Sequence, residues 1–179
     1  MLMARHRPRV NPFEETTLRF RVWPTDIDLL MHMNNGRYLT LMDLGRTDSI
    51  IRSGVMSRMK EAGWYSVVAS ETIRFRESLG LWAKFELRTR LLGWDEKSFY
   101  LRQLFLLRGR VVAVAIVRIR FLRRSGGTVP APEVAAAVIP GVLAPAMPDY
   151  VADWRKAESA FSHATGIQTT KNHRTTLGV

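Results

Sequence analysis

The sequence predicts an α+β domain in which one long central helix is wrapped by a curved antiparallel sheet of about five strands. Three observations predict it. A single strand-like segment opens the domain, helical spacing of apolar residues begins at Gly36, and strand-like alternation returns after Gly63. Since every apolar face must be covered by another layer, one helix beneath one curled sheet accommodates this order of elements.

The first strand is predicted over Thr17–Val22, where polar and apolar residues alternate. Pro24 ends it. The loop Thr25–Asn35 that follows is rich in carboxylate and amide side chains, and Asn34 or Asn35 is suited to cap the next helix.

A long helix is predicted from Gly36 to about Ser53, with a further turn or short helix reaching Lys60. Its predicted buried face contains Tyr38, Leu41, Met42 and Gly45. Gly45 and Gly54 each lower helix stability relative to alanine unless another element packs closely there.

Four strands are predicted after Gly63, over Trp64–Arg76, Leu81–Leu92, Lys97–Leu107 and Arg110–Leu122. The separators between them are short, so we expect an antiparallel meander. Val111–Val117 is apolar on both faces, which is typical of a central strand covered on both sides. Arg108-Gly109 is expected to form a hairpin turn.

The remainder of the chain is expected to wrap around this core. Thr128–Pro148 contains five prolines and many alanines, and Asp149–His163 is predicted to be a terminal helix with Trp154 and Phe161 on its buried side. The prediction is therefore one domain over residues 1–179, with a core of about 16–122, a wrapping segment and helix over 128–165, and a polar, frayed tail over 167–179.

The composition is that of a folded protein, with 46% hydrophobic and 24% charged residues in 179 positions. The absence of cysteine excludes a disulfide framework, a thiolate metal site and a cysteine nucleophile. The basic N-terminal segment lacks the apolar run of a secretory signal, and Val111–Val117 is too short to span a membrane. We expect a soluble, cytoplasmic protein.

The formal net charge of +11 has three interpretations. Nucleic-acid binding would require clustered charges, whereas Arg88 and Arg90 alternate with other residues along a strand, so no nucleic-acid partner is predicted. In the second interpretation the positive charge attracts a polyanionic small molecule, and coenzyme A, with its phosphates, is such a molecule. Coding bias with a solvated, arginine-rich surface is the third.

The segment before the predicted helix carries the residues best suited to chemistry, namely Asp26, Asp28 and His32. A helix N-terminus offers free backbone N–H groups that polarise a carbonyl or hold an oxyanion. A carboxylate beside it can act as nucleophile or as general base for water, and an imidazole can orient it or move protons. This combination suits thioester hydrolysis.

Motifs of other hydrolases and of cofactor enzymes are missing. The sequence contains no G-x-S-x-G elbow, phosphate loop or G-x-G-x-x-G fingerprint. Its four histidines lack metal-ligand spacing. Neither a cofactor nor a metal is predicted.

The string Asp-x-Asp-x-x-x-His-x-Asn-Asn-x-x-Tyr, from Asp26 to Tyr38, resembles the signature of hot-dog thioesterases of the 4-hydroxybenzoyl-CoA and acyl-carrier-protein thioesterase kind. The resemblance covers about Thr16–Leu122. The chain most resembles proteins similar to thioesterase superfamily member six, through His32–Asn35 with Arg37–Leu39 and a second match at Arg88–Asp95.

The resemblance implies a hot-dog acyl-CoA thioesterase that acts on acyl-CoA or a related acyl thioester as a homodimer or homotetramer, with sites between subunits. In such enzymes a loop carboxylate attacks the thioester or activates water while the helix N-terminus polarises the carbonyl. Asp28, paired with His32, is the better match to the catalytic carboxylate, and Asp26 is a supporting candidate. The implied substrate-binding residues are Asn34, Asn35, Gly36 and Tyr38.

Two other interpretations remain open. A hot-dog module that binds acyl chains or a protein partner without catalysis is suggested by Leu30 and Met31, which depart from the family pattern. In a purely structural interpretation, Asp26 and Asp28 satisfy loop N–H groups and Tyr38 belongs to the core. A hot-dog dehydratase is disfavoured because its Asp-x-Asn-Pro-x-His run is absent.

Overall fold

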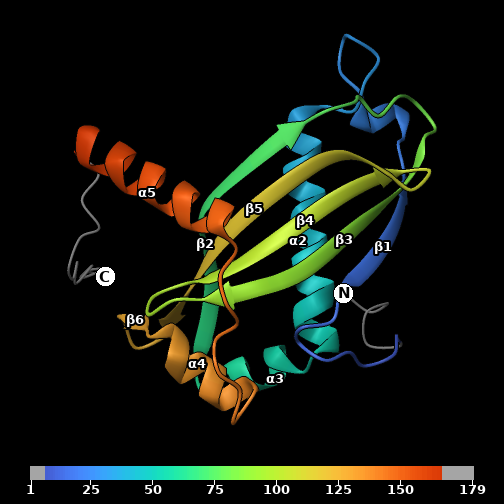
Figure 1. Ribbon diagram of the computed structural model, residues 1–179. Coiled ribbons are helices and arrows are strands. Elements are labelled where there is room, and N and C mark those ends of the chain that lie inside the picture. Colours follow the sequence, from blue (N-terminus) through green and yellow to red (C-terminus); the bar gives the residue numbers. More distant parts are fainter. Residues whose placement is uncertain (1–6, 167–179) are drawn as a thin grey trace, which may run out of the picture.

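The computed structural model describes residues 7–166, in which one sheet curls around a central helix (Figure 1). In chain order the elements are β1 (Thr16–Arg21), the 3-10 helix η1 (Pro24–Asp26), α2 (Asn35–Arg52), α3 (Val55–Glu61), β2 (Trp64–Phe75), β3 (Lys84–Trp94), β4 (Phe99–Leu107), β5 (Arg110–Arg123), β6 (Thr128–Val129), α4 (Ala131–Val138) and α5 (Asp149–Ala164). The predicted α+β class is confirmed. The tail expected to be frayed, 167–179, lies outside the described residues.

The strand order corrects the predicted meander. The strands run β1-β3-β4-β5-β2, all antiparallel, so β2 pairs with β5 and only β3, β4 and β5 form a meander. The reason is that the segment after β2 crosses the end of the sheet instead of turning back on itself. Its Leu79 is fully buried and accepts a hydrogen bond from the Met33 N–H at 2.8 Å.

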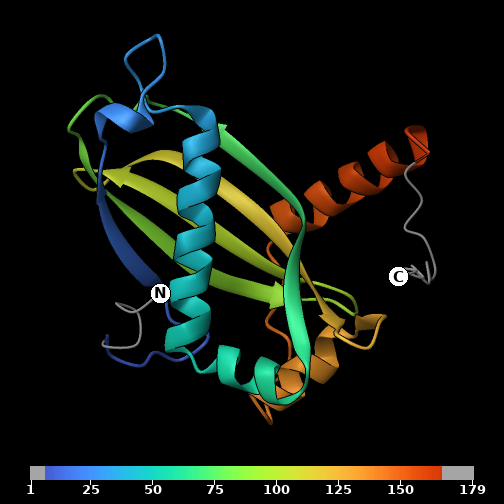
Figure 2. The same cartoon turned by 180° about the vertical axis from the view of Figure 1, so that it is seen from behind.

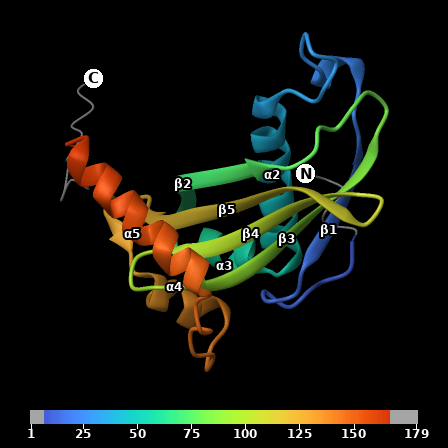
Figure 3. The same cartoon turned by 45° about the horizontal axis from the view of Figure 1, so that its top comes forward.

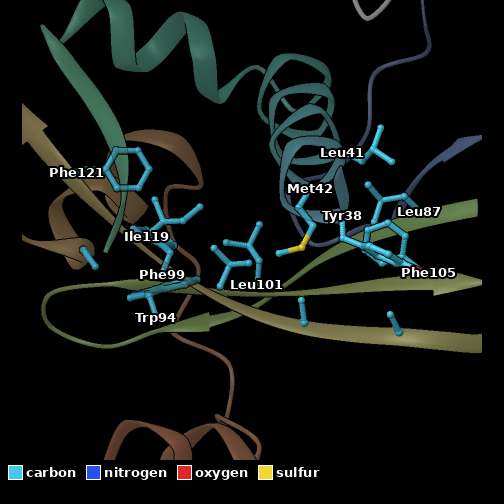
Figure 4. Close-up of a cluster of buried hydrophobic side chains, with 14 of the residues drawn as sticks. Tyr38, Leu41, Met42, Leu87, Trp94, Phe99, Leu101, Phe105, Ile119 and Phe121 are labelled. Carbon is cyan, nitrogen blue, oxygen red and sulfur yellow. The ribbon is translucent and has the colours of Figure 1, made fainter. Parts of the chain in front are cut away.

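The core lies between α2 and the concave face of the sheet (Figure 2). Tyr38 packs edge-on against Phe105 of β4, with ring centroids 4.8 Å apart, and Leu87 of β3 lies beside them (Figure 4). Full burial of such side chains stabilises the fold by about 1.5–3 kcal/mol each. The predicted buried face of the helix is confirmed.

A polar cluster interrupts this apolar interface at the middle of α2. The Gln103 side chain, which is 0% exposed, donates to the Met42 carbonyl at 3.0 Å and to the Thr89 hydroxyl at 2.9 Å. Arg46 donates to the Gln103 amide oxygen at 2.9 Å and lies 3.5 Å from Glu71 on β2. These contacts join α2 to three strands.

Gly45 allows the helix to approach the sheet this closely, as the sequence suggested. A Cβ atom there would lie 2.8 Å from the Thr89 hydroxyl oxygen and 2.9 Å from both the Gln103 amide nitrogen and a Leu87 methyl. Gly54 is different: its φ of +78° ends α2 and starts α3, with nothing near it.

We expect Gly45→Ala to lower the free energy of unfolding by about 1–3 kcal/mol, because the added methyl overpacks a filled interface. Urea denaturation followed by circular dichroism measures this. Helix propensity alone would raise stability by up to about 1 kcal/mol. A stabilised variant would therefore contradict the close packing.

The C-terminal elements lie on the outside of the sheet and at its end. The predicted wrapping segment contains β6 and α4, and the predicted terminal helix is α5, which covers the face opposite α2 (Figure 3). Trp154 is half-buried against Tyr100, with ring centroids 6.4 Å apart. Phe161 is 65% exposed, so its predicted place on the buried side is wrong: α5 projects beyond the sheet at that end (Figure 1).

Within residues 7–166, no helix combines the length and apolar character required for a membrane span.

Candidate active site

The loop between β1 and α2 is closed by the side chain of Asp26. Asp26 is only 5% exposed, and its Oδ2 accepts from the Trp23 N–H at 2.9 Å. Its Oδ1 lies 2.7 Å from Nε of Arg37, in the first turn of α2, and its carbonyl accepts from the Asn34 N–H at 2.8 Å. These contacts tie the start of the loop to the start of the helix.

Replacing Asp26 by asparagine tests this bracing role. Asparagine retains an acceptor for the Trp23 N–H but loses the charge opposite Arg37, so we expect the free energy of unfolding to fall by about 1–3 kcal/mol. Urea denaturation measures the change. The matched control is Asp153→Asn, which removes an exposed ion pair with Lys156 on α5 and should cost less than about 0.5 kcal/mol. Equal stability of the two variants would contradict the role of Asp26.

Asp28 occupies a different environment at the tip of the loop. It is half-buried, and its Oδ1 accepts from the Leu30 N–H at 2.9 Å in an Asx-type turn. Its N–H donates to the His32 carbonyl and its carbonyl accepts from the Met31 N–H, so backbone bonds close the turn. Among the described residues, its second carboxylate oxygen has no hydrogen-bond partner.

The turn places Met31 at φ +61°, a left-handed conformation that is strained for this residue type. Leu29, Leu30 and Met31 are exposed at the tip, and the loop projects beyond the end of the sheet (Figure 1). Strained backbone held in place by paired neighbours is a feature of functional loops. This tip is an exposed apolar surface beside a carboxylate.

His32 is brought near Asp28 by the backbone, and its own main chain bridges to Gly80 in the crossing segment. Its side chain is exposed. Across residues 7–166, no hydrogen bond or ion pair joins this imidazole to the carboxylate of Asp26 or Asp28.

Asn34 is the N-cap of α2, as the sequence suggested. Its Oδ1 accepts from the Gly36 N–H at 2.8 Å, and its carbonyl accepts from the Arg37 N–H. Asn35 is exposed, and its N–H has no partner in the part of the chain that the structure describes. The Asn35 N–H is therefore an open backbone donor at the start of the helix, where the macrodipole also favours negative charge.

Tyr38 belongs to the core and packs between Phe105 and Phe75, whose ring centroids are 4.8 and 4.9 Å away. Burial raises the pKa of its hydroxyl above the usual value, opposed by a backbone hydrogen bond at Leu79. The hydroxyl therefore remains protonated at neutral pH.

The structure thus brings the predicted loop residues together at the amino end of α2 but divides them by environment. Asp26, Asn34 and Tyr38 have intramolecular partners, whereas Asp28, His32 and Asn35 present polar groups outward. Two neighbouring contributions were not recognised from the sequence. Arg37 holds Asp26, and the Trp23 and Trp82 rings meet edge to face at 5.4 Å beside the loop.

Comparison with known proteins relates the chain to thioesterases. The family model of the thioesterase-like superfamily matches residues 22–154. The chain is 46% identical to Protein THEM6 of Xenopus laevis over 106 residues, which are 59% of this chain and 51% of that protein. It is 42% identical to Protein THEM6 of Danio rerio over 113 residues, which are 62% and 56% of the two chains. The chain thus spans about half the length of these curated relatives.

Solved structures share the fold, which confirms the predicted hot-dog architecture. A probable thioesterase of Escherichia coli, YbaW, has a TM-score of 0.65 at 23% identity and covers 71% of this chain and 98% of its own. The BH1999 gentisyl-coenzyme A thioesterase has a TM-score of 0.60 at 21% identity, covering 67% and 98%.

Proposed function

Because the chain belongs to the thioesterase-like superfamily, we propose that it hydrolyses an acyl-CoA or a related acyl thioester, with Asp28 as its catalytic carboxylate. One observation carries the proposal. The loop that leads into α2 holds a half-buried carboxylate with an oxygen left unpaired among residues 7–166, and the Asn35 N–H at the start of the helix is likewise open there.

The proposed reaction uses these two groups on opposite sides of one carbonyl. The Asn35 N–H and the helix dipole stabilise negative charge on the thioester oxygen, as an oxyanion donor does. Asp28 either attacks the carbonyl carbon or removes a proton from the water that does so. The carbon–sulfur bond then breaks, the thiol leaves with a proton, and water supplies the new oxygen of the acid.

The other loop residues act around this centre in the proposal. His32 orients the carboxylate or moves the proton to the leaving thiolate. Asn34 and Gly36 shape the backbone that faces the substrate, and Tyr38 supports that backbone from below. Asp26 is a positioning residue, because its Oδ atoms are already committed to Trp23 and Arg37.

A second copy of the chain is part of the proposal, as a homodimer or a homotetramer. β2 pairs only with β5 within residues 7–166, so its other edge is open, and it carries the exposed Tyr65, Val68 and Phe75. Open apolar edges favour strand pairing between chains. Light scattering after gel filtration measures the mass of the particle, and a monomer would contradict this part of the proposal.

Hydrolysis of a panel of acyl-CoAs that differ in chain length, followed by thiol release, tests the activity directly. Wild type should turn over at least one of them. An absence of turnover, or unchanged turnover in both Asp26→Asn and Asp28→Asn, would refute the proposal.

A second candidate is a module that binds acyl chains or a protein partner without hydrolysing a thioester. It is favoured by the exposed Leu30 and Met31 at the loop tip. Calorimetry separates the two candidates, since saturable binding of an acyl-CoA without thiol release would support the binding module.

A further inference from the structure

α5 and the outer face of the sheet form an open cleft of about 800 Å³. The sheet contributes Tyr100 of β4 with Arg118 and Arg120 of β5, and the helix contributes Arg155 and Glu158. Small-molecule sites in proteins have volumes of about 300–1,000 Å³. The cleft is therefore large enough for an organic ligand.

The two walls of this cleft are fixed to one another. Glu158 of α5 lies 3.0 Å from Arg118 and also contacts the Ser70 hydroxyl on β2. Arg155 lies 3.4 Å from Asp95, at the start of the β3–β4 turn. Val151 of α5 is fully buried. Elements far apart in the sequence thus hold the cleft open.

The cleft has an excess of positive charge. Its carboxylates are Asp95 and Glu158, and each is already engaged by an arginine. Its cations are Lys97, Arg118, Arg120, Arg155 and Lys156. Five cations against two carboxylates leave an excess of three, so the field inside favours an anion.

Unsatisfied donors point to the same ligand chemistry. Within residues 7–166, the buried Nε atoms of Arg118 and Arg120 have no hydrogen-bond partner, and Arg120 forms no ion pair. A buried donor without a partner is destabilising. Guanidinium groups that alternate along one strand offer forked donors that match the oxygens of a phosphate.

The Tyr100 hydroxyl stabilises the acidic side of the cleft. It donates to Asp95 at 2.8 Å, and its pKa is raised to about 12 by burial and by this hydrogen bond. Burial alone would raise the pKa of Asp95. Hydrogen bonds from the Lys97 N–H, the Tyr100 hydroxyl and the Ser98 N–H, together with Arg155, lower it below its usual value. Asp95 therefore remains ionised and keeps Arg155 in place.

We propose that this cleft is a second site, which binds a small phosphate-bearing anion. It is lined by α5, which covers the sheet face opposite α2 and lies away from the β1–α2 loop (Figure 3). The segment that crosses the sheet beside the loop is anchored at Val112, whose carbonyl accepts from the Arg76 and Glu77 N–H groups. Arg118 lies six residues further along β5, which places the Arg118 backbone about 20 Å from Val112. Binding here is independent of the proposed hydrolysis.

Isothermal titration calorimetry of the full chain with inorganic pyrophosphate tests the site. Wild type should bind one pyrophosphate per chain, and Lys97→Gln/Arg120→Gln should weaken binding tenfold or more. The matched control is Arg58→Gln/Lys60→Gln on α3, which removes the same two kinds of charge from an exposed helix and should change the affinity less than twofold. Sulfate at equal ionic strength should compete only weakly.

Two results would overturn the proposal. One is an absence of saturable binding to wild type. The other is equal weakening in the control, which would reflect the overall charge of the chain. Thermal melting checks that each variant is folded. If the double variant misfolds, Lys97→Gln alone still tests the site. Lys97 is exposed, so this variant should fold, and it should weaken pyrophosphate binding severalfold.

Discussion

Asp28→Asn should lower the turnover of acyl-CoA by a factor of about 10²–10⁴, the contribution typical of a positioned catalytic base or nucleophile. Asparagine is nearly the same size and retains an Oδ1 that accepts from the Leu30 N–H, so the Asx-type turn is preserved. The substitution removes the charge and little else. Thiol release at saturating substrate measures kcat, which is expected to carry most of the loss.

The stability of the variant separates chemistry from folding. Asp28 is half-buried and forms no ion pair within residues 7–166, so the free energy of unfolding of Asp28→Asn should stay within about 0.5 kcal/mol of wild type. Asp153→Asn removes an exposed carboxylate from α5 and should leave turnover unchanged. Full activity of Asp28→Asn would assign the chemistry to another residue.

Local features of the fold were predicted well because their causes lie within a few residues. The bounds of α2 follow from apolar spacing, and its cap follows from the short polar side chain of Asn34, which reaches the Gly36 N–H two residues later. Glycine in a helix interior is unfavourable unless another element packs closely there, and this reasoning identified a close approach at Gly45 but not at Gly54, which ends the helix.

Strand pairing was not predictable in the same way. The residues 77–80 have the composition of a turn, yet Leu79 is buried under the β1–α2 loop and carries the chain across the sheet. The partner of β2 is β5, whose paired residues lie from 38 (Phe75 with Ala113) to 59 (Trp64 with Arg123) positions further along the chain. Short separators favour hairpins on average, but the need to cover α2 from both sides overrides that preference.

The distinction between the two loop aspartates also required three dimensions. Asp26 and Asp28 are both loop aspartates, two residues apart, and only the family resemblance favoured Asp28 over Asp26. Only the fold shows that Asp26 is enclosed by Trp23 and Arg37. Arg37 lies 11 residues after Asp26 in the sequence, but that spacing does not bring the two side chains together unless the path of the loop is known.

Arg46→Met should be strongly destabilising, lowering the free energy of unfolding by about 3 kcal/mol. Arg46 is 5% exposed and donates to Gln103 while contacting Glu71 and Asp43. Breaking a buried charge pair costs about 3–5 kcal/mol. We expect the lower value of this range because the Asp43 and Glu71 carboxylates are partly exposed, so water can solvate them once the guanidinium is removed. Methionine keeps most of the stem volume, so the loss reports the lost polar contacts.

A double-mutant cycle identifies the source of that loss. Gln103→Leu alone leaves the Arg46 guanidinium without its buried acceptor, whereas Arg46→Met/Gln103→Leu replaces both groups by apolar ones. The double variant should therefore cost less than the sum of the single variants, by about 0.5–3 kcal/mol for residues in direct contact. Urea denaturation of the four proteins gives this coupling energy. Strictly additive losses would mean that the Arg46–Gln103 hydrogen bond contributes no coupling energy between α2 and β4.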